Sequence, residues 1–140
     1  MEIVKKTSLI KKLKNILKPV LFWLMPDVKK NDKALENVSI NIISNILGLG
    51  NAATPAGISA MSELGKVNEN KKQISDSMMM LIVINTTSIQ LIPTTIIAIR
   101  ASLNSANPSN IIVPIWISTI VGTFMGIFIT KLLIKRGKKV

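Results

Sequence analysis

The chain has 140 residues, of which 48% are hydrophobic and 18% charged, with a formal net charge of +11. That length allows one domain. The ranges 37–62, 77–99 and 101–130 contain no charged residue, whereas a soluble domain spreads charges over its outer surface. Cys and His are absent, which excludes disulfides, thiol and imidazole catalysis and most zinc or haem sites. The composition predicts an integral membrane protein.

The basic excess indicates a lipid bilayer as partner rather than nucleic acid. The 18 Lys and Arg residues flank apolar segments, and Tyr is absent, so the aromatic residues that usually accompany nucleic-acid binding are scarce. Lysines of membrane proteins collect on the cytoplasmic side and near anionic headgroups. We therefore expect no nucleic-acid partner.

Residues 1–36 are predicted to be a first domain, a basic amphipathic helix with a linker. Apolar residues recur at helical spacing with lysines between them: Leu9, Leu13, Ile16, Leu17, Val20, Leu21 and Leu24, with Lys5, Lys6, Lys11, Lys12, Lys14 and Lys18. Such a helix lies on a membrane surface, with Phe22 and Trp23 at the interface, or packs on its own protein as a solvated helix. Pro19 is expected to kink or break it. The charged stretch Pro26–Glu36 is expected to be a linker.

Residues 37–140 are predicted to be a membrane domain that begins with a broken helix, Val38–Ser62. In its first half, Asn41, Ser44 and Asn45 form one polar stripe because they are three or four residues apart. Gly48 and Gly50 favour a break, after which Thr54 is expected to cap a second helix. Pro55 would be the first residue of that helix and Gly65 its stop. Each half of about 10 residues is too short to cross a bilayer, so the segment is a re-entrant hairpin or one broken span.

Two further apolar segments are long enough to cross. The segment Ser77–Ile99 is interrupted by Asn85–Ser88, Gln90 and Pro93, and proline interrupts the hydrogen bonding of a helix. A loop at Asn104–Pro108 separates it from the uncharged span Ile111–Thr130. Basic residues anchor the end of that span: Lys131, Lys135, Arg136, Lys138 and Lys139.

The distribution of basic residues decides between the two topologies. If Val38–Ser62 crosses fully, the Lys and Arg residues divide 10 against 8, and if it enters and returns they divide 17 against 1. The positive-inside rule favours the second arrangement. We therefore predict an all-α membrane protein with a basic N-terminal helix, a re-entrant hairpin and two transmembrane helices, one of them broken. The basic termini are expected on the cytoplasmic side of the cell membrane.

The helix breaks are the candidate binding site. Non-helical backbone at membrane depth must line a cavity or be buried in protein, and in transporters broken helices form binding sites at the midplane. Neutral side chains near the two breaks are the candidate ligand-binding residues: Asn51, Thr54, Asn85, Thr86, Thr87, Ser88, Gln90 and Thr94. Gly48, Gly50, Pro55 and Pro93 are the candidate structural elbows. The alternative is that these polar residues only hold helices together.

The acidic residues argue against an enzyme. All seven Asp and Glu residues lie outside the uncharged segments, so no carboxylate is available at membrane depth for proton transfer. Acid–base hydrolysis and metal catalysis lose their usual groups for the same reason. We expect no catalytic residue, no metal and no cofactor.

Two blocks of the sequence resemble a known family. The stretch from Asn45 to Leu64, NILGLGNAATPAGISAMSEL, and the stretch Asn85–Arg100 with Ser105–Pro108 after it closely resemble the spore maturation protein A family. That family belongs to the nucleoside-recognition, or gate, group of membrane domains. The resemblance implies a membrane protein acting late in sporulation, in spore core dehydration and heat resistance, together with spore maturation protein B. Family members usually carry a hydrophobic segment ahead of the region matching Met1–Lys18, so we expect a shortened form or one whose bundle a partner completes.

Three hypotheses follow for the molecular role. The first is a gate-type subunit of a transporter or channel for a small polar solute, nucleoside-like or other. The second is a membrane scaffold or assembly factor for spore maturation protein B, without transport. The third gives the basic N-terminal helix the main role, in binding anionic lipid. Because two spans cannot enclose a pathway, transport requires a homo-oligomer or a complex with spore maturation protein B.

Overall fold

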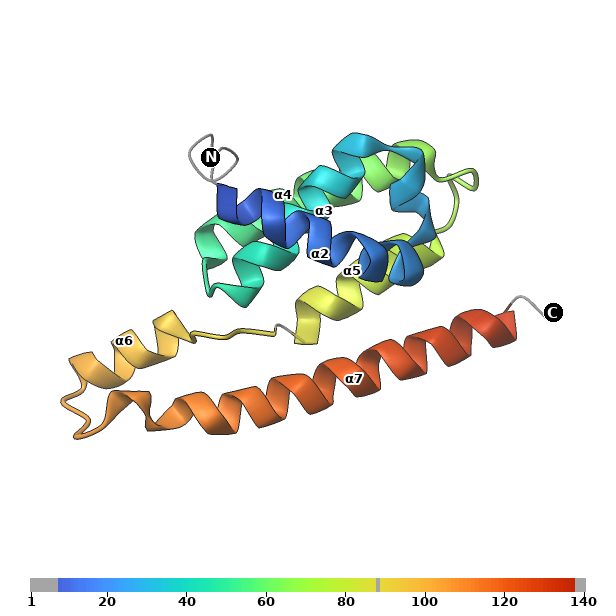
Figure 1. The fold of residues 1–140 in the computed structure, drawn as a ribbon. Coiled ribbons are helices and arrows are strands. Elements are labelled where there is room, and N and C mark those ends of the chain that lie inside the picture. The colour runs from blue at the N-terminus through green and yellow to red at the C-terminus, as the bar shows by residue number, and fades with distance from the viewer. Residues whose placement is uncertain (1–7, 88, 138–140) are drawn as a thin grey trace.

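The computed structural model describes residues 8–87 and 89–137, and every regular element within these ranges is a helix. This confirms the all-α class. The helices form two groups, with the first three long helices above the last one (Figure 1). In chain order the elements are α2 (Ser8–Leu24), η1 (Pro26–Lys30), α3 (Asp32–Ile46), α4 (Gly50–Val67), α5 (Asp76–Thr87), α6 (Thr94–Ser102), η2 (Pro108–Ile111) and α7 (Ile112–Gly137).

Helix α2 packs on its own protein through part of its apolar stripe. Leu21 and Leu24 are buried in a core that also contains Met25, Val28, Ala34, Leu35, Val38, Ala60, Leu64, Met80 and Leu81. Trp23 on the other side of the helix is 65% exposed. The helix runs through Pro19, so the expectation of a break there is wrong. The first seven residues, with Lys5 and Lys6, lie outside the described residues.

The stretch Pro26–Glu36 is ordered into helices, which corrects the prediction of a linker. The 3-10 helix η1 takes up its first half, and α3 begins at Asp32, so the expected domain boundary after residue 36 falls inside α3. Asn31 caps this helix, because its Oδ1 accepts the backbone N–H groups of Lys33 at 2.9 Å and Ala34 at 3.2 Å. The charged residues that indicated a linker occupy the outer face of these helical turns.

Helices α3 and α4 form an antiparallel hairpin whose open ends are fastened by Asn31. The Asn31 Nδ2 group donates to the Glu63 carboxylate at 3.0 Å. The hydrogen bond from Lys66, and after it this one from Asn31, lower the pKa of Glu63. The α4 side of the contact consists of small residues, Ala53, Ala56 and Ala60, each at most 4% exposed. Small residues allow two helix backbones to approach closely.

The hairpin turn is shorter than predicted. Helix α4 starts at Gly50 with Leu49 as its N-cap residue, so Thr54 is not a cap and Pro55 lies inside the helix. The Leu49 carbonyl starts the helix by accepting the N–H groups of Ala52 and Ala53, both at 3.0 Å. Gly65 also lies inside α4, which continues to Val67. The expected start at Pro55 and stop at Gly65 are therefore wrong.

The break expected within Ser77–Ile99 is present. Helix α5 ends at Thr87, and α6 begins at Thr94 after the N-cap residue Pro93. Helix α7 lies along α5 (Figure 1). Their contact uses small groups: the Thr123 hydroxyl donates to Thr87 Oγ1 at 2.9 Å, and a Cβ placed on Gly126 would lie 3.0 Å from Val83 Cγ1.

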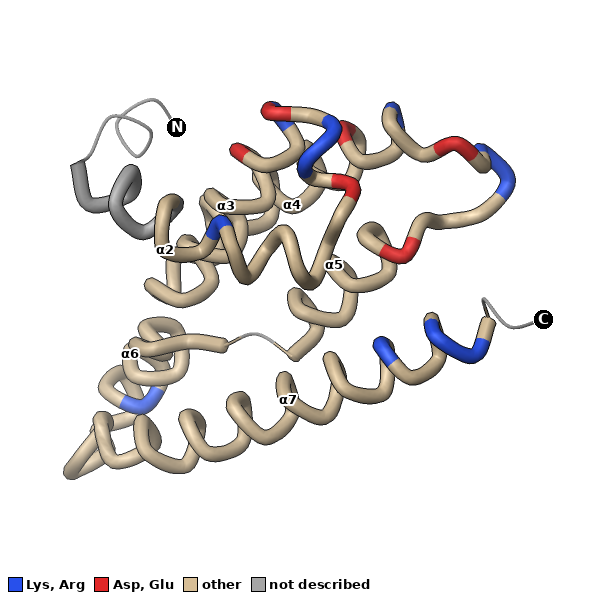
Figure 2. Tube along the Cα trace, turned by 45° about the vertical axis from the view of Figure 1, so that its right-hand side comes forward, with Lys and Arg blue, Asp and Glu red and all other residues tan. Residues whose placement is uncertain are grey.

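Helix α7 is the apolar element of the described chain. The most apolar 18-residue window of the helical stretch Pro108–Gly137 has a mean hydropathy of 2.1, and only 6% of that window is buried. Within residues 8–87 and 89–137, this is the one helical stretch that is long and apolar enough to cross a membrane. Charged residues gather elsewhere, around η1, the ends of the hairpin, the loop before α5 and the last turns of α7 (Figure 2). Arg100 lies in the last turn of α6, where it donates to the Pro108 carbonyl just before α7.

We expect Gly48→Ala to destabilise the fold strongly. Gly48 has φ +71°, and a Cβ there would lie 2.1 Å from the Ile92 carbonyl oxygen. The strained backbone and the clash together should lower the free energy of unfolding by at least about 3 kcal/mol. Thermal unfolding of the purified protein in nanodiscs, followed by circular dichroism, measures the loss.

The matched control is Gly65→Ala, because a Cβ on Gly65 would have nothing within 4 Å. Alanine in a helix interior should add about 0.5–1 kcal/mol of stability. Equal behaviour of the two variants would contradict the close contact at Gly48.

Candidate functional site

The two helix breaks lie in direct contact. The Leu91 N–H, between α5 and α6, donates to the Ile46 carbonyl at the end of α3 at 2.8 Å. The Thr94 hydroxyl donates to the Gly48 carbonyl at 3.0 Å. Backbone carbonyl groups left free where α3 stops are thus hydrogen-bonded by groups of the other break.

Helix α7 also reaches this junction. Trp116 Nε1 donates to the Leu91 carbonyl at 2.8 Å, so three segments distant in sequence meet at residues 46–48, 91–94 and 116. Pro93 is fully buried there. Of the predicted elbow residues, Gly48 and Pro93 lie in the junction, whereas Gly50 starts α4 and Pro55 lies within it.

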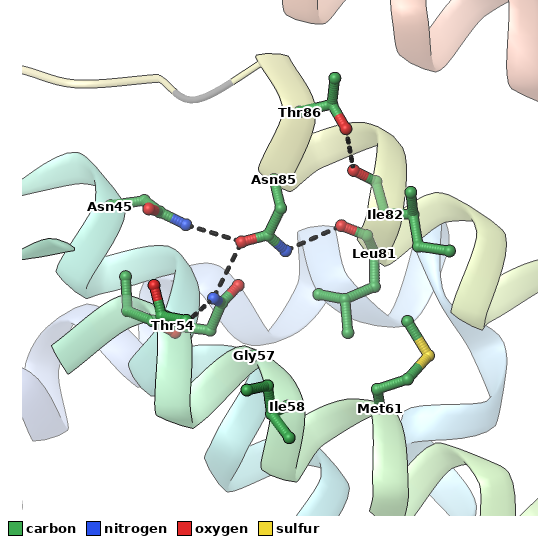
Figure 3. A pocket seen from close by; sticks show the side chains of 11 residues that line it. Asn45, Thr54, Gly57, Ile58, Met61, Leu81, Ile82, Asn85 and Thr86 are labelled. Atoms are coloured by element: carbon green, nitrogen blue, oxygen red, sulfur yellow. Dashed lines mark hydrogen bonds between the residues drawn. The ribbon is translucent and has the colours of Figure 1, made fainter. Parts of the chain in front are cut away.

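A cluster of three side-chain amides lies beside the junction (Figure 3). We call Asn41 and Asn45 of α3 and Asn85 of α5 the amide cluster. Asn41 Nδ2 and Asn45 Nδ2 each donate to Asn85 Oδ1 at 2.9 Å. Asn41 Nδ2 also donates to the Ala53 carbonyl at 2.9 Å, and Asn85 Nδ2 donates to the Leu81 carbonyl at 2.8 Å. The cluster therefore ties the hairpin to the broken segment.

Asn41 Oδ1 is the exception in this network. Asn41 is 1% exposed, and its Oδ1 is buried without a hydrogen-bond partner. Leaving a buried polar atom unpaired costs about 1–3 kcal/mol, so such an atom calls for an explanation. Asn41 is also one of the residues that line an adjoining space, so its Oδ1 is the candidate binding group for an occupant of that space.

That space is a pocket of about 550 Å³, which we call the amide pocket. Gly57 makes room for it, because a Cβ at this position would lie 2.8 Å from Asn41 Nδ2. None of the lining residues is charged: Asn41, Asn45, Ala53, Thr54, Gly57, Ile58, Met61, Leu81, Ile82, Asn85 and Thr86 (Figure 3). The volume suits a small solute.

The predicted site residues divide into two groups. Thr54, Asn85 and Thr86 line the amide pocket. The other described residues of the predicted set do not line it. Thr87 contacts Thr123 of α7, Thr94 contacts Gly48, Asn51 is exposed and Gln90 is half-buried. Ser88 lies outside the described residues.

Sequence reasoning missed three residues of the site, Asn41, Asn45 and Gly57. The polar stripe on the first half of the hairpin was the signal for the two asparagines, because residues four apart share a helix face. Gly57 carried no signal of its own, since only the packing shows that a side chain there would meet Asn41.

A second, polar hollow of about 290 Å³ lies at the charged end of the molecule. Lys30 Nζ lies 3.1 Å from Glu69 and 3.7 Å from Asp27, and the hydrogen bond to Glu69 raises the pKa of Lys30. These ion pairs are exposed and contribute little to stability. Within the described ranges no group of three or more His, Cys, Asp or Glu residues is placed to hold a metal ion.

Fold and site together define an all-helical protein with a membrane-length apolar helix and an amide-lined pocket beside two meeting helix breaks. No family model and no solved structure matches the chain. It is 35% identical over 139 residues to spore maturation protein A of Bacillus subtilis (strain 168), a match covering 99% of this chain and 71% of that protein. The chain therefore belongs to the spore maturation protein A family, and with its apolar helix α7 it is a membrane protein of sporulation.

A double-mutant cycle between Asn45→Ala and Asn85→Ala tests the amide cluster. Because Asn45 Nδ2 donates directly to Asn85 Oδ1, we expect a coupling free energy of about 0.5–1.5 kcal/mol in unfolding experiments.

The control cycle pairs Asn51→Ala with Asn85→Ala. Asn51 is exposed and does not line the pocket, so this coupling should stay below about 0.5 kcal/mol. If the amide cluster did not exist, both cycles would give the same small coupling free energy.

Proposed function

We propose that this protein is a gate-type subunit of a membrane pathway for a small polar solute, acting in spore core dehydration and heat resistance. The observation that carries the proposal is the contact between the two helix breaks, Leu91 to Ile46 and Thr94 to Gly48, directly beside the amide pocket. In lipid, backbone that leaves the helix must be buried in protein or line a cavity. Here the two breaks pair with each other next to a pocket lined by polar side chains, and broken helices beside a binding site are typical of transporters.

The proposed topology has two spans. The 26 residues of α7 extend about 39 Å, longer than the hydrocarbon core of about 30 Å. The broken segment α5–α6 runs antiparallel to α7 and forms the other span, while the α3–α4 hairpin enters the membrane and returns. Its open ends lie together at the Asn31–Glu63 contact, which supports entry and return on one side.

The ends of the two spans carry the residues expected at membrane interfaces. At the basic end, Lys131 Nζ donates to the Trp23 carbonyl at 2.7 Å and lies 4.6 Å from the centre of the Trp23 ring. At the other end, the Arg100 guanidinium donates to the Pro108 carbonyl at 3.2 Å. Trp and Lys side chains favour the headgroup region, and the clustering of Lys residues at one end supports a cytoplasmic location for it (Figure 2).

Transport requires more helices than this chain provides, so we propose assembly with spore maturation protein B or a second copy. The second candidate function is a scaffold for spore maturation protein B that moves no solute. One observation favours it: Thr87, adjacent to pocket-lining Thr86, bonds to Thr123 across the α5–α7 contact. Some of the hydroxyl residues near the breaks therefore hold helices together.

Single cysteines introduced into this cysteine-free chain test the topology. We expect Lys33→Cys at the start of the hairpin and Lys72→Cys after it to be shielded from a membrane-impermeant thiol reagent in intact cells. Ala106→Cys, in the exposed loop before η2, should react. Permeabilised cells provide the control for reactivity. Labelling of Lys72→Cys but not Lys33→Cys from outside would show that the hairpin crosses completely.

Substitution of the amide cluster separates the two candidate functions. In a sporulating host without its own copy, Asn85→Leu should abolish spore heat resistance while the protein still accumulates and still co-purifies with spore maturation protein B. The matched control Asn51→Leu, on an exposed residue outside the pocket, should retain resistance. Loss of co-purification with Asn85→Leu would favour the scaffold, and full resistance would exclude a role for the pocket.

A further inference from the structure

Every side-chain donor group that lines the amide pocket has at least one hydrogen-bond partner within the protein, whereas one of its acceptors has none. The Asn41 and Asn45 amide nitrogens donate within the protein, to Asn85 Oδ1 and the Ala53 carbonyl. The two lining hydroxyls donate to their own helices, Thr54 to the Gly50 carbonyl at 3.3 Å and Thr86 to the Ile82 carbonyl at 2.9 Å. A hydroxyl has one proton and two lone pairs, so both retain acceptor capacity only.

Counting donors and acceptors in the same way at Asn41 identifies its Oδ1 as the acceptor that most needs a partner. Its Oδ1 is buried and unpaired, and its Nδ2 already has two partners, Ala53 and Asn85. An occupant that donates a hydrogen bond to Asn41 Oδ1 would satisfy an atom that the protein alone leaves unpaired. An occupant with acceptors alone would leave it unpaired and add unpaired atoms of its own.

The lining also opposes ions. None of the lining residues carries a charge, and transferring an ion into a space without an opposite charge is unfavourable. A cation would find oxygen atoms on one side only, because the remaining walls are apolar: Ala53, Ile58, Met61, Leu81 and Ile82. Hard cations require several oxygen ligands around them.

We propose that the amide pocket binds a small, uncharged solute through hydrogen-bond donors on the solute, with Asn41 Oδ1 as the group that selects it. Thr54 and Thr86 supply further acceptors at the rim, and the apolar walls accept the carbon frame of the solute. The proposal rests on the proposed function for the use of the pocket in transport. Binding itself is a separate property and is tested separately.

The test is protection of a cysteine at the pocket rim by solutes that differ in one property. Ile58 lines the pocket and is 67% exposed, so Ile58→Cys places a thiol at the rim of the complete chain in nanodiscs. N-methylacetamide carries one N–H donor, whereas N,N-dimethylacetamide has the same carbonyl and no donor. We expect N-methylacetamide to slow alkylation by an uncharged maleimide, about twofold when its concentration equals its dissociation constant, and N,N-dimethylacetamide to have no comparable effect.

Two variants link the protection to the acceptors. In the Ile58→Cys background, Asn41→Leu or Thr86→Val should reduce protection by N-methylacetamide. Thr86→Val keeps the experiment informative if Asn41→Leu does not fold. Thr119→Val is the matched control, because Thr119 makes the same kind of bond to the Ile115 carbonyl on α7, outside the pocket. A separate variant, Ile117→Cys, places a thiol on α7 at a position that is 62% exposed. It reports any general effect of the solutes on thiol alkylation and should not be protected.

The remaining outcomes overturn the proposal. Equal protection by both amides would show that donors do not matter. Protection by sodium acetate or by sodium chloride would show that the pocket binds an ion instead of an uncharged solute. Absence of protection by every solute would mean that the pocket binds none of them. If Asn85→Leu abolishes heat resistance while N-methylacetamide gives no protection, the proposed function stands and the solute class is wrong.

Discussion

The requirement that backbone N–H and C=O groups be paired shapes this whole molecule. A helix that ends leaves carbonyl groups without partners, and lipid offers none. The Ile46 and Gly48 carbonyls end the first half of the hairpin, and the break before α6 satisfies both of them. The Leu91 carbonyl on the opposite side is satisfied by the indole of Trp116. Each break is therefore stabilised at its position by the hydrogen-bond partners that the other segments supply.

Polar side chains with similar chemistry have two different uses around these breaks. Asn85 and Thr86 face the amide pocket, while Thr87, one residue further, bonds to Thr123 of α7. Consecutive residues of a helix point about 100° apart, so one turn of α5 both lines the pocket and fastens the last helix. Neighbouring polar residues of α5 therefore differ in position, because some line the pocket and others contact another helix.

Helices could be predicted from the sequence where composition alone determines them. The uncharged span Ile111–Thr130 has the length of a membrane helix, and α7 covers it from Ile112 onward. The break before Pro93 followed from the missing N–H of proline. The start of α4 did not, because Thr54 and Pro55 carry a common helix-start pattern, whereas the actual start at Gly50 depends on the Leu49 carbonyl and on a φ of +71° at Gly48. Those features belong to the packing of Gly48 against Ile92, which no local pattern encodes.

Only part of the candidate site could be predicted from the sequence, because the rest of it also depends on packing between helices. Asn85 and Thr86 stood out as polar residues within an apolar run, and both line the pocket. Asn41 lies in an equally apolar run, but its importance depends on two features outside that run: the amide of Asn85 and the absence of a side chain at Gly57. Residues of three helices, α3, α4 and α5, therefore together determine the surroundings of one acceptor atom, Asn41 Oδ1. The pocket remains bordered by exposed apolar residues, with Ile58 at 67% and Ile82 at 46% exposure. Apolar side chains exposed at the rim of a pocket require a cover of lipid or protein, and the proposed assembly with another subunit would supply such a cover.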